Sequence, residues 1–471
     1  MGVIARFLKT SSLYMLGNAL TRLIAFLLIP LYTTYLSPDE FGYFNLAGNI
    51  ATVIVPFFSM EIWTGLIRFL LDTQNEANRE RFANAGLCIT VISIAAYTAL
   101  YGAITINYDV PLLGYIYFYC AMQCLQSVSC SFARGFGHNV LFAVSGIVAS
   151  IVTIGLNIIL IASFGIGAKA LFISTGIGYL AQAVVIECKV RSLRYILPKY
   201  FNRRTLGEML RFSAPLSLGT VCYWFSTGYS SVAISQAQGL SENGMYAVAG
   251  RFVGVLLLLN QVFTLASQEI LFKADGSRQK LYNASMNYYF KFLSICTLAM
   301  IVLTKTVYPI MVGEAFAGSL RFVPLYFLAS FVSYFAIYLG NYFLKEGKTA
   351  GNALSLLVPG TVNVVILHLL IGRIGTDAAA VGLLVGYAGS AAMRIVQLRR
   401  FTEIRFDYRY LFGFVALSAL TFLVFFQLGS VWNLAWALAL GTILVWQFRQ
   451  YIGPTLAEFK TLARRNKEKQ A

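Results

Sequence analysis

Residues 13–36 read LYMLGNALTRLIAFLLIPLYTTYL, an apolar run long enough to cross a lipid bilayer as a helix. Two basic residues, Arg6 and Lys9, precede it. The run is too long for the apolar core of a cleaved signal peptide, so we expect a retained first transmembrane helix. Similar apolar blocks, separated by short polar joints, follow along the whole chain.

The composition is that of a membrane protein. Hydrophobic residues make up 58% of the 471 positions, charged residues 12%, and the mean hydropathy is +0.70. Water cannot solvate such a surface, which excludes an ordinary soluble globular protein. We predict an all-α polytopic membrane protein with about 14 transmembrane helices. The expected spans are 11–36, 44–71, 83–106, 112–133, 140–163, 170–188, 210–235, 246–272, 286–304, 322–344, 353–371, 376–398, 411–428 and 431–448.

The basic residues indicate how the chain crosses the membrane. Lys and Arg number 36 against 19 Asp and Glu, a formal net charge of +17, and they gather in alternate joints, most densely in residues 189–211. Because cytoplasmic joints collect Lys and Arg, this pattern predicts that both termini are cytoplasmic. The charge is spread over many joints and forms no single basic face, so we expect contacts with membrane lipids and no nucleic acid partner.

An internal repeat appears when the chain is shifted by 202 positions without a gap. The shift superimposes Leu8, Ser11, Leu16, Gly17, Glu40, Gly42, Ala47 and Gly48 on Leu210, Ser213, Leu218, Gly219, Glu242, Gly244, Ala249 and Gly250. Six spans per copy is an even number, so the two copies share one orientation, as in transporters with parallel repeats. We therefore expect an N-terminal six-helix lobe (1–188), a cytoplasmic linker (189–209), a C-terminal six-helix lobe (210–400), and two extra transmembrane helices with a basic cytoplasmic tail (401–471).

Several short motifs carry a family resemblance. They are Leu-Gly-Asn-Ala-Leu at 16–20, Ile-Pro-Leu-Tyr at 29–32, Leu-Ser-Pro-Asp-Glu-Phe-Gly-Tyr-Phe-Asn-Leu-Ala at 36–47, Phe-Ser-Ala-Pro-Leu at 212–216, and Asn157 followed by Gly-Ile-Gly-Ala at 165–168. With these motifs the chain resembles the Wzx-type oligosaccharide flippases of the multidrug/oligosaccharidyl-lipid/polysaccharide (MOP) exporter superfamily. One departure is Gly228-Tyr229-Ser230, where many relatives carry an acidic-basic pair late in the seventh span.

The resemblance implies a specific activity. It implies that the protein moves an undecaprenyl-diphosphate-linked oligosaccharide from the cytoplasmic to the periplasmic leaflet of a bacterial inner membrane, by alternating access, for O-antigen or capsule synthesis. A polysaccharide polymerase and a chain-length regulator are possible partners. No cofactor is implied.

Charged residues inside the predicted spans are the candidate site residues, because they tend to face a cavity or a partner. Arg22 lies deep in the first span, on one helical stripe with Tyr14 and Asn18. Its guanidinium suits a diphosphate or an acidic sugar, and the two neighbours suit sugar hydroxyls. We predict that these three residues bind substrate, unless Arg22 is paired or solvated in a structural role.

Two other spans carry spaced charges. Glu61 and Arg68 stand seven apart in the second predicted span, hence on one face. Glu61 is a candidate carrier of a coupling proton, and Arg68 either binds substrate or reaches for the membrane surface. Arg251 and Glu269 stand five helical turns apart in the eighth span, also on one face, which we expect to line the second lobe's side of a substrate cavity.

Two other function classes remain as alternatives. A polytopic polysaccharide polymerase or ligase would use the same lipid carrier, but such enzymes present catalytic residues on large extracytoplasmic loops, and the joints predicted on that side are short. A multidrug exporter of the same superfamily would favour an acidic cavity, against which Arg22 and Arg251 argue. The seven cysteines have no paired spacing that would indicate a disulfide framework or a metal. We expect a transporter that is not an enzyme.

Overall fold

The computed structural model describes residues 26–468, except 74, 274–277, 347–348, 401 and 403. Every described element is a helix. The first part of the chain forms α2 (Ile29–Tyr35), α3 (Pro38–Ser59), α4 (Ile62–Asp72), α5 (Glu76–Asn107), α6 (Leu113–Gly135), α7 (Asn139–Asn157), the π-helical η1 (Ile158–Ser163) and α8 (Ala168–Val190).

The second part begins with two short 3₁₀ helices. It comprises η2 (Ser192–Ile196), η3 (Pro198–Tyr200), α9 (Arg203–Thr227), α10 (Tyr229–Ala237), α11 (Leu240–Lys273), α12 (Arg278–Met311), η4 (Glu314–Phe322), α13 (Val323–Lys345), α14 (Thr349–Ile374), α15 (Asp377–Leu398), α16 (Tyr408–Gln427) and α17 (Ser430–Glu468).

Eleven of the described helical stretches are long and apolar enough to cross a membrane. The chain is an all-helical, multi-pass membrane protein. Most of the predicted first span lies outside the described residues. The predicted spans 112–133 and 210–235 are present as α6 and as α9 with α10, but they are not among the eleven apolar stretches. The total of fourteen spans thus stays a prediction.

The second predicted span, 44–71, is broken, so its prediction as one continuous helix is wrong. Helix α3 ends at Ser59, α4 begins at Ile62, and both Met60 and Glu61 adopt the left-handed conformation, with φ of 48° and 52°. Pro56 lies in the last turn of α3, where it lacks a backbone donor. Glu61 therefore precedes α4 instead of lying on its surface, and the inference that it shares a helical face with Arg68 fails.

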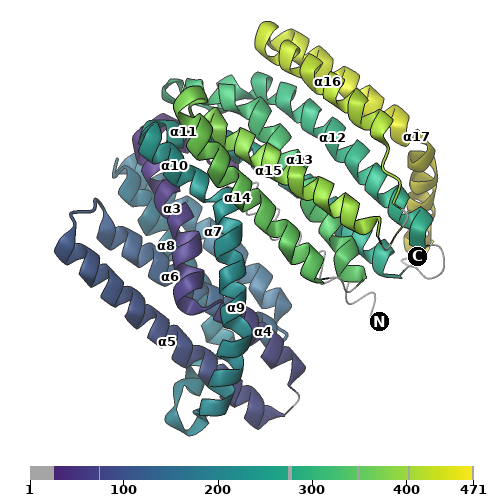
Figure 1. Ribbon diagram of the computed structural model, residues 1–471. Coiled ribbons are helices and arrows are strands. Elements are labelled where there is room, and N and C mark those ends of the chain that lie inside the picture. Colours follow the sequence, from purple (N-terminus) through teal and green to yellow (C-terminus); the bar gives the residue numbers. More distant parts are fainter. Residues whose placement is uncertain are drawn as a thin grey trace.

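The helices pack in two groups. Helices α3–α8 contact one another extensively, and so do α11–α15; we call these the first and second helix groups. Figure 1 shows the purple-to-blue ribbons of the first helix group and the green ribbons of the second meeting where α3 and α11 begin and diverging toward the opposite end. Helix α9 runs between the groups and packs on both α4 and α14.

The crossing of α3 and α11 joins the two groups most closely. The backbones approach at Gly42 and Gly244, where a Cβ atom on either residue would overlap backbone of the other helix. Helix α3 starts sharply because Ser37 and Glu40 form a capping box, with Ser37 Oγ accepting from Glu40 N at 3.2 Å. Asn45 on α3 donates to Ser231 Oγ on α10 at 2.9 Å, which adds a polar contact beside the crossing.

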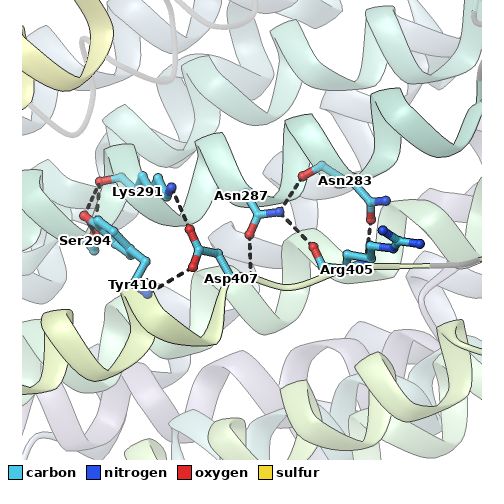
Figure 2. Close-up of polar contacts among 7 residues, drawn as sticks. All are labelled: Asn283, Asn287, Lys291, Ser294, Arg405, Asp407 and Tyr410. Carbon is cyan, nitrogen blue, oxygen red and sulfur yellow. Dashed lines mark hydrogen bonds and ion pairs between the residues drawn. The ribbon is translucent and has the colours of Figure 1, made fainter.

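The start of α16 and the segment before it attach to α12 through a polar network (Figure 2). Asn283 and Asn287 on α12 bind backbone groups of Arg405 and Asp407 at 2.7–3.0 Å. Lys291 forms an ion pair with Asp407 at 2.9 Å, and Asp407 also caps the start of α16 by accepting from Tyr410 N. The predicted basic tail is helical, because α17 continues to Glu468.

At the other end of α16, a second lysine of α12 holds the helix terminus. Lys305 Nζ donates to the carbonyl oxygens of Phe425 and Leu428. A cation at a helix C-terminus is favourable because the carbonyl groups there lack helical partners. Two lysines of α12 thus fix both ends of α16.

Candidate functional site

A polar cavity of about 530 Å³ lies within the first helix group. Helices α3, α6, α7 and α8 supply most of its walls, and α2 and α11 complete them. Its polar lining side chains are Tyr32, Asn45, Asn49, Thr52, Tyr119, Gln126, Ser150, Thr153, Thr175, Tyr179, Gln182 and Arg251. Such a mixture of amides, hydroxyls and aromatic rings can pair with sugar hydroxyl groups inside the membrane.

Helical periodicity places these side chains on facing walls. Asn45, Asn49 and Thr52 follow one another at intervals of four and three residues on α3, and residues 175, 179 and 182 repeat the pattern on α8. Residues three or four apart lie on one face of a helix. Each polar stripe therefore faces the cavity. None of these neutral residues was predicted from the sequence, because neutral side chains were considered only beside a charged residue, as with Tyr14 and Asn18 beside Arg22; their spacing was a usable signal.

Hydrogen bonds hold parts of the wall in place. Gln126 Nε2 donates to Gln182 Oε1 at 2.9 Å, and Gln182 Nε2 donates to Ser145 Oγ at 3.4 Å, which links α6, α8 and α7. Near α2, Asn157 Nδ2 donates to the hydroxyl of Tyr32 at 3.0 Å. These contacts fix the orientation of side chains that border the cavity, so the wall is largely preformed.

Arg251 is the only charged residue among those that the structure describes as lining the cavity. It comes from α11, in the second helix group, and is partly buried. Its guanidinium carbon lies 5.9 Å from the centre of the Phe41 ring, and within the described residues no carboxylate lies at ion-pair distance from it. The cavity thus combines a neutral polar wall with one cation supplied from across the α3–α11 crossing.

Glu61 lies at the break between α3 and α4, outside the residues that line the cavity. Its Oε1 accepts from Thr220 Oγ1 on α9 at 2.6 Å, and its Oε2 accepts from Thr64 Oγ1 at 3.0 Å. The carboxylate is partly buried and connects the broken helix to α9. Each carboxylate oxygen accepts a hydrogen bond from a hydroxyl group. No cation is paired with this carboxylate among the described residues.

Arg68 also lies away from the cavity. It is exposed, its guanidinium carbon is 4.2 Å from the centre of the Phe212 ring on α9, and its Nε is 3.8 Å from Asp72. Tyr14, Asn18 and Arg22 lie outside the described residues. So does the side chain of Glu269, whose backbone lies in α11. Of the predicted substrate-binding residues that are described, the structure brings Arg251 to the cavity and leaves Arg68 outside it.

The family model for polysaccharide biosynthesis proteins matches residues 7–272, which is more than half of the chain. The chain belongs to this family. Among curated protein sequences, none matches the chain significantly.

Solved structures reveal the fold that this family member shares. The lipid II flippase MurJ in an inward closed conformation superimposes with a TM-score of 0.71, at 13% sequence identity, over 94% of this chain and 99% of that chain. An inward-facing multidrug resistance transporter of the MATE family, in the MOP superfamily, superimposes with a TM-score of 0.61, at 15% identity, over 85% of this chain and 99% of that one. The chain therefore shares the fold of these two proteins, and it is a multi-pass membrane protein of the polysaccharide biosynthesis protein family.

Proposed function

We propose that this family member is a flippase that moves an undecaprenyl-diphosphate-linked oligosaccharide from the cytoplasmic to the periplasmic leaflet, for O-antigen or capsule synthesis. The observation that carries the proposal is the cavity of about 530 Å³, which is lined by neutral amides, hydroxyls and tyrosines around one arginine. Amides and hydroxyls suit sugar hydroxyls, and a guanidinium suits a diphosphate. The family match and the MurJ-like fold support the same activity.

Transport by alternating access needs two units that move against each other, and we assign them to residues 1–188 and 210–400, joined by 189–209. Repeat-related residues support this division. Glu40 Oε1 accepts from Ala168 N at the start of α8, at 3.2 Å, and Glu242 Oε2 accepts from Thr376 Oγ1 beside the start of α15, at 3.0 Å. The two glutamates, 202 positions apart, thus hold equivalent helix starts in the two groups.

The orientation of the protein rests on its charges. Because Lys and Arg gather in cytoplasmic joints, both termini and the 189–209 linker lie on the cytoplasmic side of a bacterial inner membrane. The end where α3 and α11 cross is then periplasmic and closed by their backbone contact. Reporter fusions after Arg204 and Lys467 should read cytoplasmic, and one after Glu242 periplasmic. The reverse result at Arg204 and Glu242 contradicts this orientation.

We assign the diphosphate to Arg251, with Arg22, Asn18 and Tyr14 completing the substrate contacts from the first helix. Arg68, which lies outside the described cavity, and Glu269, whose side chain lies outside the described residues, are assigned supporting contacts with the substrate. Glu61 is assigned the coupling ion, since its carboxylate sits at a helix break and bonds to α9 through Thr220. A proton or cation bound there would change the contact between α4 and α9.

Deletion of the gene tests the flippase assignment. The lipid-linked unit should accumulate in the cytoplasmic leaflet, unpolymerised, and surface glycan should be lost. The wild-type chain should restore surface glycan and remove the accumulated unit. At equal membrane abundance, Arg251→Ala should do both far less well. Arrival of the unit at the periplasmic leaflet in the deletion strain contradicts the proposal and favours the alternative of a polymerase or ligase. Export of amphipathic cations instead of glycan would favour the multidrug alternative.

A further inference from the structure

The segment between α8 and α9 is folded, although its place in the sequence is that of a linker. Residues 192–196 and 198–200 form the 3₁₀ helices η2 and η3. The Glu187 carboxylate accepts from Ser192 N at 3.0 Å and from Leu193 N at 2.9 Å, which ties the segment to the end of α8. Its position relative to the helices is thus fixed by hydrogen bonds.

A second attachment joins this segment to α5. Asn84, which is buried, donates through Nδ2 to the carbonyl oxygens of Tyr195 and Leu197, at 2.6 and 3.2 Å. The Tyr195 ring is buried against Phe136, with ring centres 6.0 Å apart. The backbone carbonyl groups and the buried ring on the inner side of the segment therefore find their partners in the first helix group.

The outer side combines large apolar side chains with cations. The exposed apolar residues are Leu193 (55% exposed), Ile196 (47%), Leu197 (46%) and Phe201 (53%). Between and beside them stand the exposed basic residues Arg191, Arg194, Lys199, Arg203 and Arg204. From 187 to 208 the chain has only two carboxylates, Glu187, which caps η2, and Glu208, which pairs with Arg204 at 3.1 Å.

We propose that residues 191–204 form an interfacial anchor that binds anionic phospholipids of the bilayer the protein spans. The segment leaves α8 at Val190, the last residue of a membrane-spanning helix, so it begins at the membrane surface. Apolar side chains next to Lys and Arg suit the boundary between acyl chains and headgroups, and each basic residue strengthens binding to an anionic surface about fivefold. The position of residues 191–204 directly after a membrane-spanning helix favours lipid over a soluble protein partner, because a soluble protein could bind such a surface anywhere outside the membrane.

The anchor has a mechanical consequence for transport. The hydrogen bonds of its η2 part go to α5 and α8, both in the first helix group, while Asn202 caps α9. Binding to headgroups therefore holds the first helix group at a fixed depth. We expect a relative movement of the two groups to leave the depth of the first helix group unchanged.

A tryptophan at position 197 tests the proposal. Leu197→Trp replaces an exposed side chain, and its fluorescence in nanodiscs is compared with that of the parent chain. The nanodiscs contain phosphatidylcholine and phosphatidylglycerol, with bromine on the acyl chains of one or the other lipid. We expect quenching beyond the parent, stronger by about twofold or more with brominated phosphatidylglycerol.

Two charge variants complete the experiment. Lys199→Gln with Arg203→Gln should bring the quenching by the two lipids to parity. Arg400→Gln with Arg409→Gln, which removes the same charge from exposed positions outside the anchor, should leave the preference unchanged. Absence of quenching beyond the parent overturns the anchor, and equal quenching by both lipids in the Leu197→Trp chain overturns its selectivity for anionic lipid. If the charge variants do not accumulate, the lipid comparison on the Leu197→Trp chain alone decides.

Discussion

The first and second helix groups differ in what fills their centres. In the first, polar side chains surround a cavity of about 530 Å³. In the second, tyrosine rings stack on one another: Tyr246 on Tyr326 with centres 4.6 Å apart, and Tyr289 on Tyr338 with centres 3.9 Å apart. Two related stretches of chain thus build one interior with a polar-lined cavity and one closely packed interior.

Residues 202 positions apart, which are equivalent in the internal repeat, show where the two interiors begin to differ. A Cβ on Gly48 would have only the Tyr119 hydroxyl near it, at 4.0 Å, whereas one on Gly250 would lie 3.0 Å from a ring carbon of Tyr326. The next pair is Asn49 and Arg251, and both line the cavity. Under the proposed function, neutral contacts with substrate would be concentrated in the first group, and the second would contribute one cation.

The largest expected effect is on stability. Tyr338→Ala should destabilise the protein by about 3–5 kcal/mol, because it removes a fully buried ring from the stack. Tyr179→Ala should cost much less, since that ring borders the cavity. Thermal unfolding of the purified protein measures both. Equal losses would mean that the two interiors are packed alike.

Removal of the cavity cation should have the next largest effect, on transport. Arg251→Ala should lower surface glycan synthesis on the order of thirtyfold, the equivalent of losing one charged hydrogen bond of about 2 kcal/mol. Arg251→Lys should retain more activity, because a point charge survives. Arg400→Ala is the matched control, as it removes an exposed arginine that does not line the described cavity. Wild-type transport by Arg251→Ala at equal abundance would contradict a role of the cation.

The glycine pair separates the two interiors directly. Gly48→Leu should unfold at nearly the wild-type temperature yet transport poorly, because the added side chain enters open space near the substrate path. Gly250→Leu should lower stability by about 1–3 kcal/mol, because it must displace the Tyr326 ring. Unfolding temperature and surface glycan are measured for both. A stable, active Gly48→Leu protein would argue against substrate passing this wall.

The sequence predicted most of the helices because apolar length is a local signal. The capping box of Ser37 and Glu40 is local too, but it was not used, so the predicted span began at residue 44 whereas α3 begins at Pro38. The break at Met60 and Glu61 was missed, since neither residue is a glycine and left-handed backbone is rarely expected there.

The two interiors were harder to foresee. The stack of Tyr289 on Tyr338 joins residues far apart in the chain, and no local pattern indicates it. Arg251 was identified because a charge inside a span is conspicuous. Asn45 and Asn49 were not, because a neutral amide in a span is equally compatible with simple helix packing.

The smallest expected effect concerns the attachment of α16 to the second group. The hydrogen bond from Lys291 holds the pKa of Asp407 below its ordinary value, so folding favours the ionised carboxylate. This contribution to stability is present above the unfolded-state pKa of about 3.9 and is lost as the pH falls through the lower folded-state pKa. The two side chains are 29% and 37% exposed, which limits the contribution to about 1 kcal/mol or less.

Asp407→Asn isolates the charge of this pair, because asparagine can still cap α16 but cannot form the ion pair. The variant should be slightly less stable than wild type at pH 7, and the difference should vanish once acid has protonated Asp407. Thermal unfolding of both proteins between pH 7 and pH 3 measures it. If the difference in stability between the two proteins stays constant down to pH 3, the effect comes from the cap of α16 alone and not from the ion pair. Transport should be unchanged at neutral pH, since the pair lies on α12 and α16, which supply no residue to the described lining of the cavity.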